Sequence, residues 1–161
     1  ITVHSVIVPL FIMETRIGLS NTRLGVIIPY IAFGLPLAVY LAMAYIRSMP
    51  DSIMESARID GAGYLAIFRR IIVPMSAPVM TTITILTFIN HWNEFVFVFV
   101  LTSGERLRSL PVGINAFAGT LVNNFGLQFA ALVIGIVPMI LFYLFFHRQM
   151  KQGFAEGAVK V

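Results

Sequence analysis

The residues best suited to chemistry form two polar groups in a largely apolar chain. One is a charged segment, ESARIDG at positions 55–61, followed by IIVP at 71–74. The other comprises Thr87, Asn90, His91 and Glu94, whose spacing of i, i+3, i+4 and i+7 places them on one face of a helix. Amide and carboxylate groups can hold a polar solute or a neighbouring helix, and a charged segment can dock a protein or rest on lipid headgroups.

The composition places these groups in a membrane protein. Hydrophobic residues make up 58% of the 161 residues and charged residues 11%, against about 25% charged in a soluble domain. So few charges cannot cover a soluble surface, and lipid must cover much of it. The chain has no cysteine, which excludes disulfides and thiolate metal sites. It also lacks a phosphate-binding loop, a metal-ligand spacing and a basic block, so the sequence predicts no enzyme activity, no cofactor, no metal and no nucleic-acid partner.

The apolar stretches predict an all-α fold, a polytopic bundle of transmembrane helices. Residues 24–46, 78–101 and 125–146 are long enough to cross about 30 Å of hydrocarbon, and the second stretch carries a polar interruption. Residues 1–13 are apolar but too short to span alone, and we interpret them as the end of a helix that begins upstream. The chain is therefore expected to be the C-terminal part of a single, longer transmembrane domain.

Basic residues predict the orientation of these spans. Seven lie in residues 47–77 and in the tail at 148–161, and four lie on the opposite side. The excess of basic residues places 47–77 and the C-terminus in the cytoplasm. The sequence thus predicts a multi-pass protein of the cell membrane. The glycines of the tail are expected to prevent a long helix there.

Residues 50–75 are predicted to form a cytoplasmic helix–turn–helix. Asp51 or Ser52 is expected to cap the first helix, and Gly61 can adopt positive φ and end it. Residues 64–73 are expected to form the second helix, with prolines marking the return to the bilayer. On physical grounds alone, the segment could be an interfacial helix that touches anionic lipid or a docking element for a cytoplasmic partner.

The spacing within this segment resembles the EAA loop of permeases of ATP-binding cassette importers. That pattern is Glu-Ala-Ala, three residues, Gly, nine residues, Ile, any residue, Leu, Pro, and this chain has Ser at the second position and Val in place of Leu. RIDGA at 58–62, WNEF at 92–95 and SLPVG at 109–113 are similar to elements of the maltose-type carbohydrate subfamily. The resemblance covers nearly all of residues 24–161.

The resemblance implies a membrane subunit of a carbohydrate importer that works by alternating access. The implied partners are cytoplasmic ATP-binding subunits, a second permease subunit, an extracytoplasmic solute-binding protein and membrane lipid. ATP hydrolysis would take place in the ATP-binding subunits. The positions matching the coupling motif, and therefore expected to contact those subunits, are Glu55, Ser56, Ala57, Asp60, Gly61, Ile71 and Pro74.

The second polar group has two interpretations. Its residues Thr87, Asn90 and Glu94, with Asn93, are candidates to line the translocation path, where amide and carboxylate groups could bond sugar hydroxyls. They could equally tie their helix to a neighbour through buried hydrogen bonds. The apolar stretch at 114–121 is expected to pack over the outer face or to contact the solute-binding protein.

Two other functions stay open at the level of sequence. A permease of the same superfamily could carry another solute, such as a polyamine. A membrane-anchored scaffold could dock a soluble partner without transporting anything. The residues alone do not name the sugar, nor do they show whether the second permease subunit is a copy of this chain.

Overall fold

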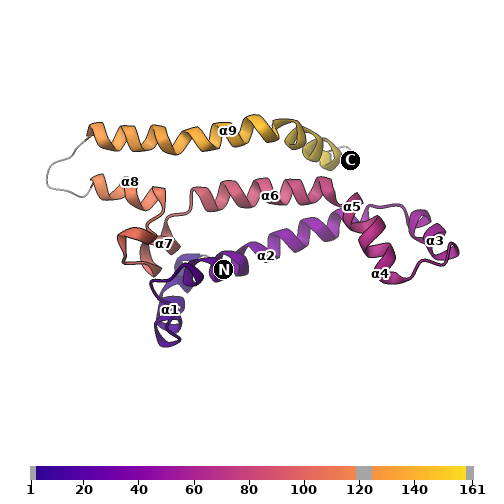
Figure 1. The fold of residues 1–161 in the computed structure, drawn as a ribbon, viewed down its shortest axis with the longest axis horizontal. Helices are drawn as coiled ribbons and strands as arrows, with labels where there is room; N and C mark the ends of the chain where they lie inside the picture. Colours follow the sequence, from indigo (N-terminus) through magenta and orange to yellow (C-terminus); the bar gives the residue numbers. More distant parts are fainter. Residues whose placement is uncertain (1–2, 119–124, 159–161) are drawn as a thin grey trace. The chain divides into compact units, whose positions relative to one another are not determined.

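The predicted all-α class is confirmed. The structure, a computed structural model, describes residues 3–118 and 125–158, with side chains described within 5–117 and 125–146, and this part of the chain contains helices and turns but no strand. Figure 1 shows the order of the elements. They are α1 (Val3–Arg16), α2 (Arg23–Arg47), α3 (Asp51–Ile59), α4 (Tyr64–Ile67), the π-helix η1 (Phe68–Ile72), α5 (Val73–Met75), α6 (Ala77–Trp92), α7 (Val96–Leu101), the 3-10 helix η2 (Glu105–Leu107), α8 (Leu110–Ala118) and α9 (Phe125–Ala158).

Within the residues that the structure describes, two helices are long and apolar enough to cross a membrane. They are Arg23–Arg47 and the Phe125–Phe146 part of α9. A third candidate span is bent, because the segments Tyr64–Met75 and Ala77–Trp92 meet at 61°. Hardly any of the residues in the two long spans are buried within this chain. Such surfaces suit contact with lipid or with further helices, since packing rather than exclusion of water holds membrane helices together.

The stretch 78–101 is two helices rather than one. Helix α6 ends at Trp92, residues 93–95 interrupt the helix, and α7 begins at Val96. The break has a local cause, because Glu94 Oε1 accepts a hydrogen bond of 2.9 Å from the backbone N–H of Phe97. A carboxylate that takes a first-turn N–H in this way starts a new helix. The prediction that Glu94 shares one helical face with Thr87, Asn90 and His91 is therefore wrong, because Glu94 lies in the break.

The expectation for the C-terminal tail is also wrong in part. Helix α9 runs on to Ala158 through Gly153 and Gly157. A glycine in a helix costs only about 1 kcal/mol relative to alanine. Two glycines therefore do not end the helix that the long apolar segment Phe125–Phe146 has already formed. The tail residues 159–161 and residues 119–124, which include part of the apolar stretch 114–121, lie outside the described residues.

The chain divides into two compact units. One comprises Ile1–Phe33 and Ile89–Leu144, and the other comprises Gly34–Phe88 and Phe145–Val161. The core of the first unit consists of Ile7, Phe97 and Leu101, where α1 packs against α7.

Asn21 forms hydrogen bonds between the connection of α1 to α2 and the segment that follows α7. Its φ of 58° is a left-handed conformation, which asparagine tolerates better than most residues. Its side-chain Oδ1 accepts hydrogen bonds of 3.0 Å from the backbone N–H groups of Ser103 and Gly104. Its own backbone N–H donates to the carbonyl of Leu101 at 2.9 Å. One residue thus joins two turns that lie some eighty positions apart in the sequence.

Candidate functional site

The turn between α3 and α4 has a defined geometry. Gly61 has a φ of 78°, as predicted. Its backbone N–H donates to the carbonyl of Arg58 at 3.0 Å, and the N–H of Ala62 donates to the carbonyl of Ala57 at 2.9 Å. These two bonds form a Schellman motif, in which the residue just past the helix is left-handed and the last carbonyls are satisfied. The turn is therefore fixed by its own backbone, with no need for a partner.

The start of α3 differs from the prediction. The N-cap position is Pro50, and no side chain caps the helix, so neither Asp51 nor Ser52 has the predicted role. The hydroxyl of Ser56 donates instead to the carbonyl of Ser52 at 2.8 Å, within the helix. A carboxylate in the first turn still complements the helix dipole, and Asp51 occupies that position.

The positions that the sequence predicts to be coupling residues on α3 and its turn fall into two groups. The side chains of Glu55, Ser56 and Asp60 are exposed. Ala57 is only 8% exposed, so its small side chain serves packing within this chain rather than lying on the free surface. Between the exposed carboxylates, Ile59 is 85% exposed, which is unusual for an isoleucine outside a lipid-facing helix.

A contact across the turn joins the two short helices. The guanidinium carbon of Arg58 lies 5.5 Å from the centroid of the Tyr64 ring, within cation–π distance. Tyr64, the first residue of α4, is 83% exposed. Together with the backbone bonds at Gly61, this contact holds α3 against the start of α4.

The second helix begins at Tyr64 as predicted but continues past the predicted end to Met75. Residues 68–72 form a π-turn, and the N–H of Val73 bonds to the carbonyl of Phe68. Pro74 follows directly, and its missing N–H and bulky ring do not fit the usual i→i−4 pattern. Among the coupling positions, Pro74 is exposed and Ile71 is half-buried.

Glu94 is engaged by its own chain on both oxygens. Oε1 bonds the backbone of α7, as described above, and Oε2 accepts a hydrogen bond of 2.7 Å from the hydroxyl of Tyr30 on α2. The Tyr30 ring stacks on the imidazole of His91, with centroids 4.3 Å apart and planes at 13°. It also meets the edge of the Phe97 ring at 5.8 Å. The arrangement matches the second interpretation of the polar stripe, in which Glu94 ties helices together.

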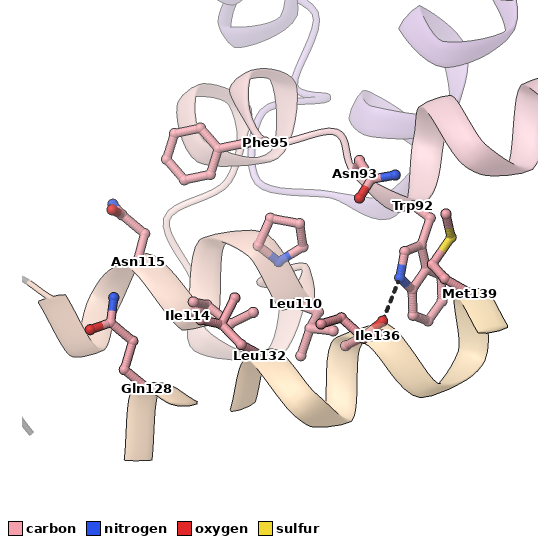
Figure 2. Close-up of a pocket in the computed structure, with 12 residues that line it drawn as sticks. Trp92, Asn93, Phe95, Leu110, Ile114, Asn115, Gln128, Leu132, Ile136 and Met139 are labelled. Carbon is pink, nitrogen blue, oxygen red and sulfur yellow. Dashed lines mark hydrogen bonds between the residues drawn. The ribbon is translucent and has the colours of Figure 1, made fainter. Parts of the chain in front are cut away.

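A pocket of about 480 Å³ lies beside the helix break. Three segments line it, namely the end of α6 with the break, α8, and the first half of α9, and Figure 2 shows their side chains. The indole N–H of Trp92 donates to the carbonyl of Gly135 at 3.2 Å, which ties α6 to α9 at the pocket wall. The lining residues are Trp92, Asn93, Phe95, Leu110, Pro111, Ile114, Asn115, Gln128, Leu132, Gly135, Ile136 and Met139.

The predicted path residues have different surroundings. Asn93 lines the pocket, and its side-chain amide donates to the carbonyl of Ile89 at 2.8 Å. Asn90 is exposed on α6. Thr87 belongs to the second unit, whereas the other three belong to the first. Glu94 is absent from the pocket lining.

Sequence reasoning missed Tyr30, Asn115 and Gln128. Tyr30 is one of three tyrosines in its apolar span, with Tyr40 and Tyr45, and single amides in apolar stretches gave no spacing pattern either. Among the residues that the structure describes, no three His, Asp or Glu side chains come close enough to hold a metal ion.

These features define an all-α membrane protein with candidate membrane spans, a helix–turn–helix and a pocket beside a broken helix. The chain belongs to the family described as "Binding-protein-dependent transport system inner membrane component", which matches residues 4–155. It is similar to the trehalose transport system permease protein SugB of Mycobacterium tuberculosis, with 39% identity over 158 residues, 97% of this chain and 58% of that protein. It is also 34% identical over 157 residues to the multiple sugar-binding transport system permease protein MsmG of Streptococcus mutans, covering 96% of this chain and 56% of that protein.

A third relative is the probable ABC transporter permease protein YurM of Bacillus subtilis, 35% identical over 154 residues. That match covers 96% of this chain and 51% of the relative. The chain thus spans about half the length of the curated relatives that it matches. The resemblance to importer permeases found in the coupling motif is confirmed at the level of the family.

Proposed function

We propose that this chain is part of the membrane-spanning subunit of an ATP-driven importer that moves a sugar into the cell. The support for a sugar comes from the relatives, whose names assign trehalose and multiple sugars to them. A solute-binding protein outside the membrane would deliver the sugar to a pair of permease subunits. Residues 47–77 and the C-terminus would face the cytoplasm, where the ATP-binding subunits reside.

The observation that carries the proposal is the geometry of the turn at Gly61. A short helix that ends in a Schellman motif and is clamped by Arg58 on Tyr64 behaves as a rigid unit, and a rigid unit transmits displacement. Charged and apolar side chains are exposed together on it, as on a surface that meets a protein partner. Glu55 is placed to pair with a cation of the ATP-binding subunit.

The mechanism follows from these parts. Closure of the ATP-binding subunits moves the segment 50–75, and the bent connection at Ser76 passes that movement to α6. Ser76 is held there because its N–H donates to the carbonyls of Ile72 and Val73 at 2.9 and 3.2 Å. Alternating access then opens the path first to the outside and then to the cytoplasm. This chain responds to ATP hydrolysis in the partner and performs none.

Reconstitution tests the proposal. The full permease pair, the ATP-binding subunits and the solute-binding protein are assembled in proteoliposomes, and uptake of labelled trehalose, maltose, diacetylchitobiose and spermidine is measured. Sugar uptake that requires both ATP and the binding protein is the expected result. Uptake of spermidine alone would make the chain a polyamine permease. Absence of uptake, with ATP-independent docking of a soluble partner, would support a scaffold and contradict the proposal.

A further inference from the structure

The pocket beside the helix break has the size and lining of a small-molecule site. Its volume of about 480 Å³ lies within the roughly 300–1,000 Å³ that such sites occupy. Most of its wall is apolar, with a few polar side chains contributed by different segments. This combination is usual for sites that hold a ligand by shape and orient it by hydrogen bonds.

Among the described residues of the wall, the polar side chains other than the indole of Trp92 are amides. They are Asn93 from the break, Asn115 from α8 and Gln128 from α9. Asn115 and Gln128 form no side-chain hydrogen bond with any residue that the structure describes, and Figure 2 shows them on the same side of the pocket. Each amide offers both donors and an acceptor, which is what a ligand carrying neighbouring hydroxyls requires.

The rest of the wall fits the apolar faces of such a ligand. The indole of Trp92 is fixed by its bond to Gly135, and the ring of Phe95 lies across the pocket (Figure 2). Fixed aromatic rings provide flat surfaces for the C–H faces of a sugar ring. None of the described lining residues is charged, and the carboxylate of Glu94 is bonded elsewhere. A cationic polyamine would therefore enter without a counter-charge, at a large desolvation cost.

We propose that this pocket is a contact site for the transported solute on this subunit, and that it accepts a neutral, polyhydroxylated ring. The amides of Asn115 and Gln128 bond its hydroxyls, and Trp92 and Phe95 cover its apolar faces. This inference rests on the proposed function, and it adds where on this subunit the solute binds and why the solute is uncharged. A lipid acyl chain is the competing occupant, since the wall is largely apolar.

Thiol protection in the assembled transporter tests the inference directly, because the printed sequence contains no cysteine of its own. The reporter is Ile114→Cys, which lines the pocket on α8. The matched control is Ala116→Cys, which is exposed on the same helix and is not part of the lining. Both are introduced into a full transporter otherwise free of cysteine, and the rate of alkylation by N-ethylmaleimide is measured with and without the sugar that the proteoliposomes transport.

The expected result is protection of the pocket thiol alone. A sugar at about ten times its dissociation constant leaves about a tenth of the sites free, so alkylation of Ile114→Cys should slow by about tenfold. Ala116→Cys should react at the same rate with and without sugar. Adding Gln128→Met, which keeps the side-chain length but removes the amide, should abolish most of the protection. Adding Thr84→Val should not, because that hydroxyl bonds its own helix.

Three outcomes would overturn the inference. Equal alkylation rates with and without a sugar that is transported would show that the pocket does not hold the solute, while leaving the proposed function intact. Protection that depends on added phospholipid and not on sugar would assign the pocket to an acyl chain. Failure to transport any sugar tested would contradict the proposed function, and this inference with it.

Discussion

Substitution of Gly61 tests whether the turn between α3 and α4 couples the permease to its ATP-binding subunits. Gly61 adopts a φ of 78°, and a Cβ added there would meet no atom within 4 Å. The cost of Gly61→Val is therefore conformational and not steric. A residue other than glycine loses roughly 1–2 kcal/mol in the left-handed region, and a β-branched residue lies at the upper end. Such a loss disfavours the native turn by a factor of about 5–30.

The assay is the ATPase activity of the reconstituted transporter, stimulated by sugar-loaded binding protein. If the turn directs α3 into its proposed partner, Gly61→Val should lower the stimulated activity by at least about fivefold, the lower end of that factor. Gly61→Asn should retain most of it, because asparagine tolerates the left-handed region. The matched control is Gly63→Val, since Gly63 has an extended φ of −72° and equally open space around a Cβ.

The result that would refute this reasoning is full stimulation in Gly61→Val, equal to that in Gly63→Val, with both complexes intact. The left-handed turn would then be irrelevant to coupling. Loss of stimulation in both variants would point instead to a requirement for flexibility throughout the segment. Protein levels and assembly are checked by co-purification of the ATP-binding subunits, so that a coupling defect is separated from a failure to assemble.

Three further substitutions test the contacts of the first unit by thermal unfolding of the purified protein in detergent and by hydrogen exchange. Tyr30→Phe leaves one oxygen of Glu94 unpaired and should destabilise the fold by roughly 1–3 kcal/mol. The control Tyr40→Phe, at a 70% exposed site, should leave the unfolding midpoint unchanged. Equal midpoints for the two variants would exclude a structural role for the bond. Leu101→Ala empties a site that is 2% exposed and should cost about 2–4 kcal/mol, a loss that would be absent if lipid filled the gap. Asn21→Ala removes two hydrogen bonds and strains a positive φ, so the two amides it accepts from should exchange faster, and unchanged exchange would show that the turns are held by other contacts.

The sequence by itself determined the class of fold and the turn at Gly61. Long apolar runs such as 24–46 and 125–146 must be helical in lipid, because each backbone polar group needs a partner within its own segment. The turn at Gly61 is equally local. It depends on six consecutive residues, Ala57 to Ala62, and on the one residue type that accepts positive φ without strain, so its spacing was enough to predict it. The same local rules overestimated the ability of the tail glycines to end a helix. The unfavourable helix propensity of single glycines is small compared with the stability of the long apolar helix that continues through them.

The tertiary structure decided what periodicity does not contain. Helical spacing placed Glu94 on a stripe with Asn90 and His91, yet its partner is Tyr30, 64 positions away, and its other oxygen ends the stripe by starting α7. The pocket likewise draws its amides from three separate segments. A pattern along one helix states which residues share a face, but the contacts of that face depend on which distant segment packs against it. That is why the turn at Gly61 was predicted from the sequence and the pocket was found only in the fold.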